Sequence, residues 1–320
     1  GRGAPRSLPP LLRQRSGSRR RCYRGGHDPR RLSRRAHAPL AGTARVPAGA
    51  ALLSDGACAQ GLLELVGGAM HGGGLRAEGG GLLHARDTRV LLPRAGGAVA
   101  AAGGMLRLHG CEVLCGAREG LAALDGGATD AVACTVARCA MEGAAVRGVG
   151  ARLDLEGCTL RENHSHGATV EDGARAALRG CRLLLNRGDG CTVVGARAAL
   201  RDTLLHSNQG HGLSVGPGAD VEVWGTAALD DGPASENLGG AEGSVIRQNH
   251  GSGVLLAGAG AALTARDTLV VGNAQRGLTA CHGAKVSSAT VACYPRARSR
   301  SPRARELLLS TERPRVGGSG

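Results

Sequence analysis

The chain has 320 residues, of which 40 are Lys or Arg and 26 are Asp or Glu, so its formal net charge at pH 7 is +14. Aromatic residues make up 1% of the chain, which disfavours a protein that stacks many sugar rings on aromatic side chains. The longest uncharged apolar stretch, near residues 95–106, is too short and too rich in glycine to cross a bilayer, which excludes a membrane span there.

The basic charge is concentrated at the two ends of the chain. Residues 1–50 carry 13 Arg and one acid, and residues 294–320 carry 7 Arg and 2 Glu, which leaves −3 for residues 51–293. Residues 1–56 show no periodicity, so we expect an Arg-rich disordered or targeting segment. Residues 294–320 are predicted to be a basic disordered tail. Nucleic acid is expected to contact these basic tails alone, if at all, and no signal assigns a cellular compartment.

Between these tails the sequence repeats with a short and nearly constant period. The pattern is weak after residue 57 and improves in copies that begin at Gly80 and Gly103. We start the next copy at Gly127, where Val132 takes an inward position and the copy is one residue short. The three clearest copies begin at Gly150, Gly173 and Gly195. A fixed period of roughly 22 to 24 residues indicates a repeat architecture.

Each copy predicts three short β-strands. When the first glycine of a copy is offset 0, apolar residues alternate at offsets 1, 3 and 5, as in Ala151, Leu153 and Leu155. Such alternation is typical of a strand with one buried face. Two more short strands follow, and Gly, Asn or Asp occupies the turns between them. One copy therefore forms one coil of a parallel β-helix, and the coils must stack because no coil can bury its inner face alone.

The motif G-C-x-L-x-x-N-x-x-x-G occurs at residues 157–167 and again at 180–190. It resembles the right-handed β-helix repeat family, which is found in pectate-lyase-like proteins and in many eukaryotic proteins of diverse role. We therefore expect an all-β fold: a right-handed, single-stranded parallel β-helix of about nine coils over residues 57–293. At strand spacing this rod would be roughly 40 Å long.

A leucine-rich repeat is the alternative, because its period is similar. Such a repeat needs an inward apolar residue two positions after its asparagine. The residues found there are Ser165, Gly188, Gly210, Gly251 and Gln275. This argues against the leucine-rich alternative.

Two columns of side chains are predicted to be structural. Offset 13 holds an amide whose stacked copies can hydrogen-bond from coil to coil and satisfy the turn backbone. Its members are Asn163, Asn186, Asn208, Asn249 and Asn273. Offset 8 holds Cys111, Cys158 and Cys181, which we expect to be small buried residues rather than disulfides or metal ligands.

Offset 16 gives the weak catalytic candidates His166, Asp189 and His211 in adjacent coils. As a functional stripe they would form a metal or acid–base site, as the resemblance to polysaccharide lyases and epimerases of this fold implies. The two histidines would be about 9.6 Å apart, two strand spacings, too far to share a zinc ion directly. We favour polar turn residues that face water, with no metal and no cofactor. We also find no stacked Asp cluster on a strand face, as such enzymes would use.

The repeat is interrupted by about 18 extra residues at 227–244, a polar insertion with Asp230, Asp231 and Glu236. Insertions in such arrays become loops and often carry recognition. Trp224 directly precedes the insertion and is either an outward anchor or, the interpretation we favour, a residue packed under its own loop. These four side chains are the candidate binding residues.

Taken together, these features favour a non-catalytic scaffold, a monomer that presents a repeat surface to a protein or polysaccharide partner. The alternative is a carbohydrate-active enzyme, a lyase, epimerase or hydrolase that acts on acidic polysaccharide.

Overall fold

The computed structural model describes residues 39–40, 44–46, 51–226, 243–288 and 291–294. The predictions for the N-terminal and C-terminal tails fall largely outside these residues, as do those for Asp230, Asp231 and Glu236. Every regular element in the described ranges is a β-strand. None of these residues lies in a helix that could span a membrane.

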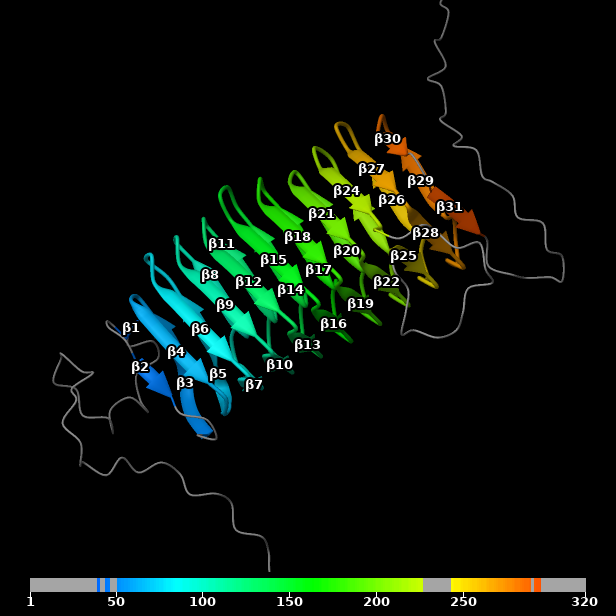
Figure 1. Ribbon diagram of the computed structural model, residues 1–320. Helices are drawn as coiled ribbons and strands as arrows, with labels where there is room; N and C mark the ends of the chain where they lie inside the picture. The colour runs from blue at the N-terminus through cyan, green and yellow to red at the C-terminus, as the bar shows by residue number, and fades with distance from the viewer. Residues whose placement is uncertain (1–38, 41–43, 47–50, 227–242, 289–290, 295–320) are drawn as a thin grey trace, which may run out of the picture.

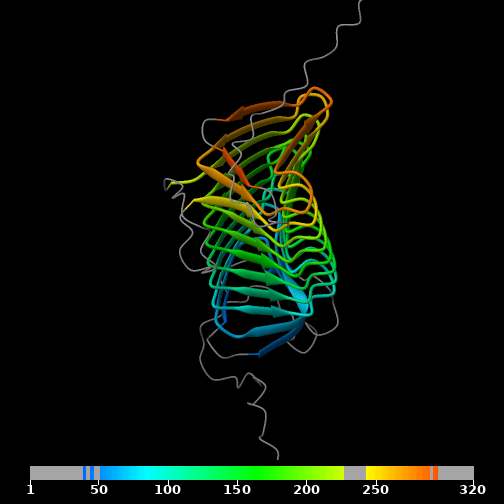
Figure 2. The same ribbon diagram turned by 90° about the vertical axis from the view of Figure 1, so that its right-hand side faces the viewer.

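The strands stack as parallel rungs along one axis, from the blue N-terminal end to the orange C-terminal end (Figures 1 and 2). Eleven strands form the surface that we call sheet 1. They are β2 (Ala44–Val46), β4 (Leu62–Val66), β6 (Leu82–Arg86), β9 (Met105–His109), β12 (Ala128–Val132), β15 (Arg152–Glu156), β18 (Arg175–Arg179), β21 (Arg197–Arg201), β24 (Asp220–Trp224), β27 (Ala262–Arg266) and β30 (Lys285–Ser288).

The remaining strands make two further rows, which we call row 2 and row 3. Row 2 contains β7 (Arg89–Leu91), β10 (Glu112–Leu114), β13 (Thr135–Ala137), β16 (Thr159–Arg161), β19 (Arg182–Leu184), β22 (Leu204–His206), β25 (Ser244–Arg247), β28 (Thr268–Val271) and β31 (Val291–Tyr294). Row 3 contains β8 (Ala98–Ala101), β11 (Leu121–Leu124), β14 (Ala144–Arg147), β17 (Ala168–Glu171), β20 (Cys191–Val194), β23 (Leu213–Val215), β26 (Val254–Ala257) and β29 (Leu278–Cys281).

Rows 2 and 3 merge near the N-terminal end. There β1 (Pro39–Leu40), β3 (Ala51–Ala59) and β5 (Ala69–Ala77) pair in succession, and β5 pairs with both β7 and β8. These first coils therefore run through a continuous long strand where later coils have a turn.

The three rows confirm the predicted parallel β-helix and exclude the leucine-rich alternative. Register in sheet 1 pairs Ala128 with Arg152, Arg152 with Arg175 and Arg175 with Arg197, so one coil takes about 23 residues. In β18 the inner residues Ala176 and Leu178 are buried, whereas its first and last residues are exposed. Alternation along each strand therefore separates a narrow aliphatic core from an outer face that is free to vary.

One copy was framed wrongly in the sequence. Because Ala128 pairs with Arg152, the coil begins at Gly126 rather than Gly127. Ala131 is then buried and Val132 is exposed on the outer face, the reverse of the expectation for Val132. A shift of one residue moves every side chain of a strand to the opposite face. The corrected frame also adds Cys134 to the buried cysteine column between Cys111 and Cys158.

The asparagines of offset 13 lie at the turn between rows 2 and 3, fully or almost fully buried. The Asn186 side-chain amide donates to Asn208 Oδ1 at 3.0 Å and to the Leu160 carbonyl at 3.2 Å. The Asn186 side-chain oxygen accepts from the backbone N–H of Asn163 at 3.1 Å. The same pattern continues through Asn249 to Asn273, so each amide closes backbone groups that would otherwise be buried without partners.

The positions beside this ladder require glycine because a larger side chain would not fit. A Cβ on Gly190 would lie 2.5 Å from the Gly212 carbonyl oxygen and 2.9 Å from the Asn208 side-chain nitrogen. The coils approach so closely at this column that a methyl group would push the ladder apart.

We predict that Asn186→Asp destabilises the fold by about 2–4 kcal/mol, because it removes two buried donors and introduces a buried charge. The matched control is Gln209→Glu, the same change of amide to acid at an exposed turn residue. Urea unfolding of both variants measures the difference. Equal stability of the two variants would contradict the ladder's structural role.

The insertion leaves and re-enters one coil at a single point. Ser244 occupies the same position as Thr203 and Thr268, since it pairs with Thr268 and its hydroxyl accepts from Thr203 N–H at 3.4 Å. A Cβ on Gly225 would be only 3.0 Å from Ser244 N. The extra residues are therefore 226–243, and they make the step from Asp220 to its partner Ala262 almost twice as long as that of a plain coil.

Deleting residues 226–243 should leave the β-helix folded, because the junction then matches the plain coil at Asp202 and Thr203. The step across sheet 1 returns to that of a plain coil, such as the one from Ala128 to Arg152. Circular dichroism and thermal melting should resemble those of the full chain. A deletion variant that unfolds would show that the insertion is part of the core.

Candidate functional site

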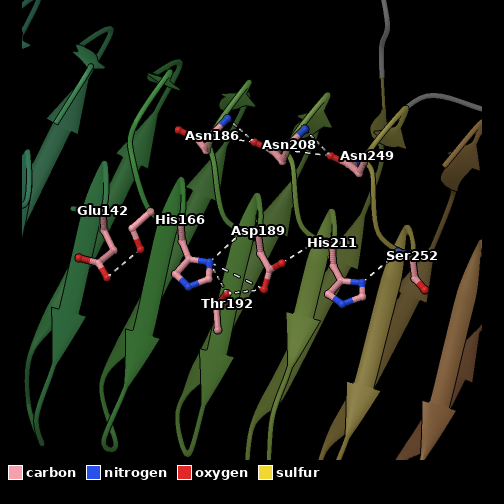
Figure 3. A network of polar contacts seen from close by, with 10 residues as sticks. Glu142, His166, Asn186, Asp189, Thr192, Asn208, His211, Asn249 and Ser252 are labelled. Atoms are coloured by element: carbon pink, nitrogen blue, oxygen red, sulfur yellow. Dashed lines mark hydrogen bonds and ion pairs between the residues drawn. The ribbon is translucent and has the colours of Figure 1, made fainter. Parts of the chain in front are cut away.

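The sequence-predicted stripe of His166, Asp189 and His211 is brought together along the outer edge of row 3 (Figure 3). Each residue directly precedes a glycine of the close-approach column. The Asp189 N–H donates to His166 Nδ1 at 2.9 Å, and the His211 N–H donates to Asp189 Oδ1 at 2.6 Å. The Ser252 N–H then donates to His211 Nδ1 at 2.9 Å. The stripe is thus a second ladder, in which a side chain accepts from the backbone of the next coil.

This arrangement assigns a state to each ring. In both rings Nδ1 is the hydrogen-bond acceptor, which leaves Nε2 as the donor nitrogen. Thr192 adds contacts to His166 Nδ1 at 3.3 Å and to Asp189 Oδ2 at 3.1 Å. The acceptor atoms are used by the fold, which leaves the Nε2–H groups of His166 and His211 as the free polar sites.

Further along the same column lies an ionic cluster that sequence reasoning missed. Arg147 contacts Glu119 at 3.2 Å, Glu142 at 3.5 Å and Glu171 at 2.8 Å. The side chains of Glu119 and Glu142 are 7% and 9% exposed. One guanidinium therefore holds carboxylates from three coils. Glu119 and Glu142 both lie at offset 16, the offset of the histidine and aspartate stripe. The sequence showed this for Glu119, but the copy wrongly started at Gly127 gave Glu142 a different offset.

On sheet 1 the structure corrects the expectation that no Asp cluster stacks on a strand face. Asp130 and Asp154 are register partners on β12 and β15, and both point outward. Arg107 lies 3.9 Å from Asp130, and Arg152 pairs with Asp154. Burial, together with the charge of Asp154, raises the pKa of Asp130. The misplaced frame had turned Asp130 inward, which is why the pair was not recognised.

The next coils of sheet 1 carry arginines in place of acids. Arg175 and Arg197 are register partners at the start of β18 and β21, and Arg179 and Arg201 are partners at the end. The half-buried Ala177 and Ala199 lie between these pairs. We call these six residues the arginine face.

Trp224 continues the last column of this face. It is half-buried, at the end of β24, with Arg201 and Arg266 as its register partners. Its carbonyl accepts from the Ser244 hydroxyl at 2.7 Å. The indole thus lies on the outer side of sheet 1, in one column between the arginines of the two neighbouring coils.

Metal binding finds no support in side-chain geometry: no group of three or more His, Cys, Asp or Glu in the described ranges could hold a metal ion. Cys134, Cys158 and Cys181 are free buried thiols. Burial raises the pKa of the neighbouring Cys139 thiol to about 11, which keeps it protonated and unreactive at neutral pH.

The family model described as "Right handed beta helix region" matches residues 96–225. This span contains the clearest coils, the arginine face and most of both polar ladders. The match confirms, over this span, the predicted resemblance to the right-handed parallel β-helix repeat family. A search of the curated proteins found no match to the sequence.

Several solved structures are similar in outline. The periplasmic alginate epimerase AlgG, in a mutant form, is 10% identical with a TM-score of 0.48, over 80% of this chain and 76% of its own. The catalytic unit of the GH87 alpha-1,3-glucanase from Streptomyces thermodiastaticus is 11% identical with a TM-score of 0.46, over 80% and 63%. The AlgE6 A-module, a mannuronan C-5 epimerase from Azotobacter vinelandii, is 14% identical with a TM-score of 0.35, over 79% and 90%. These likenesses are too distant to carry the function of those proteins to this chain.

The second ladder predicts how Asp189 responds to substitution. Asp189→Asn keeps an oxygen that can accept from the His211 N–H, so stability should stay within about 1 kcal/mol of the parent chain. Asp189→Ala removes that acceptor and should cost about 1–3 kcal/mol. Chemical denaturation of the two variants side by side tests this. If Asn is as damaging as Ala, the negative charge rather than the hydrogen bond is what matters.

Proposed function

We propose that the protein is a non-catalytic binding rod that presents its rigid outer faces to a polysaccharide or protein partner. The observation that carries this proposal is the state of the His166–Asp189–His211 stripe. Its Nδ1 and Oδ1 acceptors each take a backbone N–H from the next coil, so none is free to act as a base at those atoms. The remaining feature that could serve a function is the outer surface, which consists of parallel faces supported by a continuous core. The insertion residues Asp230, Asp231 and Glu236 stay candidate partner contacts in this proposal.

A direct test combines retention and turnover. The full chain is run through affinity gels that contain polygalacturonate, alginate or neutral dextran, and the same polymers are assayed for new reducing ends and unsaturated sugars. Light scattering reports whether the chain is a monomer. We expect retention by at least one polymer without turnover. Release of product that scales with the amount of enzyme would refute the non-catalytic proposal.

The second candidate is an enzyme on acidic polysaccharide, and the Asp130–Asp154 pair favours it. Asp154 is held by Arg152, whereas the raised pKa of Asp130 keeps that carboxyl protonated to higher pH. Glycoside hydrolysis uses two neighbouring carboxyl groups, one as acid and one as base or nucleophile. The pair is solvent-accessible, with side chains 36% and 18% exposed.

The two candidates separate cleanly by mutation. If turnover is found, Asp130→Asn and Asp154→Asn should each reduce it by at least about 100-fold. Asp189→Asn, which preserves its ladder, should leave the rate unchanged. A rate that falls with Asp189→Asn but not with the sheet 1 variants would refute the non-catalytic proposal and would place catalysis in the stripe instead of at the Asp130–Asp154 pair.

A further inference from the structure

The arginine face is unusual in its electrostatics. Its four guanidiniums form two register pairs, and register partners on neighbouring parallel strands lie about 4.8 Å apart. Like charges placed directly side by side destabilise a sheet. Nearly all basic residues of the chain are Arg, so the choice of Arg over Lys on this face carries no information. The stacking of like charges is the feature that requires an explanation.

The repulsion is poorly relieved by neighbouring acids. Arg175 and Arg179 make no ion pair with any residue in the described ranges. Arg197 is 3.9 Å from Asp220, with both side chains more than half exposed, and Arg201 is 3.4 Å from Asp202. Exposed pairs of this kind contribute little. The face therefore keeps a strong positive potential, which an anionic partner would neutralise.

Shape supports the same conclusion. The central column carries only methyl groups, at Ala177 and Ala199, so the guanidiniums stand along both sides of a low strip that runs with the axis. At its edge an open hollow of about 240 Å³ is lined by Gly173, Arg175, Gly195, Ala196, Arg197 and Gly218. The glycines leave the turn bare, so a ligand group could approach the backbone there.

Acids mark both ends of the strip. Beyond β21 it reaches Asp220 and Glu222, the exposed register partners of Arg197 and Ala199, and Trp224, whose indole can pack against a sugar ring or a guanidinium. Beyond β18 it reaches Asp154 and Glu156, the register partners of Ala177 and Arg179, while Arg152 continues the column of Arg175 and pairs with Asp154. The stretch that favours an anion is therefore limited to β18 and β21, with Trp224 beside Arg201.

We propose that the arginine face, with Trp224 beside it, is a binding site for a short stretch of a linear acidic polysaccharide that contacts β18 and β21. Guanidiniums bind carboxylate or sulfate groups through paired hydrogen bonds, and their repeat from coil to coil suits a polymer with repeated charges. Single-stranded nucleic acid is less suited, because its binding sites stack successive bases on several aromatic rings, and this face has one. The inference rests on the proposed function, since it names the partner of a binding rod.

The test measures affinity of the full chain for polygalacturonate, dextran sulfate, neutral dextran and single-stranded DNA by calorimetry at low salt. The face variant is R175Q/R179Q/R197Q/R201Q, and Trp224→Ala is measured separately. The control is R94Q/R118Q/R182Q/R187Q, which removes the same charge from four exposed arginines elsewhere. Circular dichroism verifies that both variants fold.

We expect the carboxylated or the sulfated polymer to bind, the two arms showing which oxyanion is preferred, and neutral dextran not to bind. The face variant should lose at least about tenfold in affinity, roughly one charge-assisted contact, and the control less than about threefold. Equal losses in both variants would assign binding to the basic tails or to net charge and overturn the site, while the binding rod itself would stand.

The remaining outcomes also distinguish the proposed ligand from the proposed function. Binding of DNA in preference to both acidic polysaccharides, or of none of the four ligands, overturns the proposed ligand without touching the proposed function. Cleavage of a polymer whose binding is lost in the face variant keeps the site and refutes the non-catalytic function. A face variant that fails to fold is replaced by the pair R175Q/R197Q with its control R182Q/R187Q, judged by the same ratio.

Discussion

Every coil of this protein must tolerate a copy of itself one strand spacing away, and this constraint governs the whole structure. Side chains at one offset meet their equivalents about 4.8 Å along the axis, so each column must consist of groups that fit their own kind. Asparagine does so because its amide both donates and accepts, as Asn186 does towards Asn163 and Asn208. Glycine does so where the backbones come closest, as at Gly190.

The same constraint explains how the His and Asp stripe takes part in the hydrogen bonding between coils. A side chain that accepts can be repeated indefinitely if the donor is the backbone of the next coil, whatever its identity. His166, Asp189 and His211 all meet that requirement although their chemistry differs. A mixed column of histidine and aspartate therefore need not signal catalysis in a stacked fold. It signals a position where any suitably placed acceptor is accommodated.

Much of the fold could be predicted from the sequence, because residues that stack in one column of the structure lie at the same offset in each copy of the repeat. The strands of the clear copies, their inward residues and the coil length follow from the repeat alone. Asp130 and Asp154 could not be recognised, because starting one copy at Gly127 rather than Gly126 inverted the strand that carries Asp130. The arginine face was missed for a different reason. Its arginines share offsets 2 and 6, but the sequence does not show which of these charges find an acidic partner in the folded chain.

Charge is the property that stacks least well, and the chain deals with it in two ways. In some places it sets opposite charges on neighbouring coils: Arg107 lies beside Asp130, and Arg147 is held by Glu119, Glu142 and Glu171. Such alternation turns repulsion between neighbouring coils into attraction. In other places like charges stack: Arg152, Arg175 and Arg197 follow one another in a single column, which ends where Asp220 follows Arg197. Arg152 is paired with Asp154, whereas Arg175 and Arg179 have no ion-pair partner in the described ranges. This difference marks the arginine face as the place where a partner from outside can supply the missing negative charge.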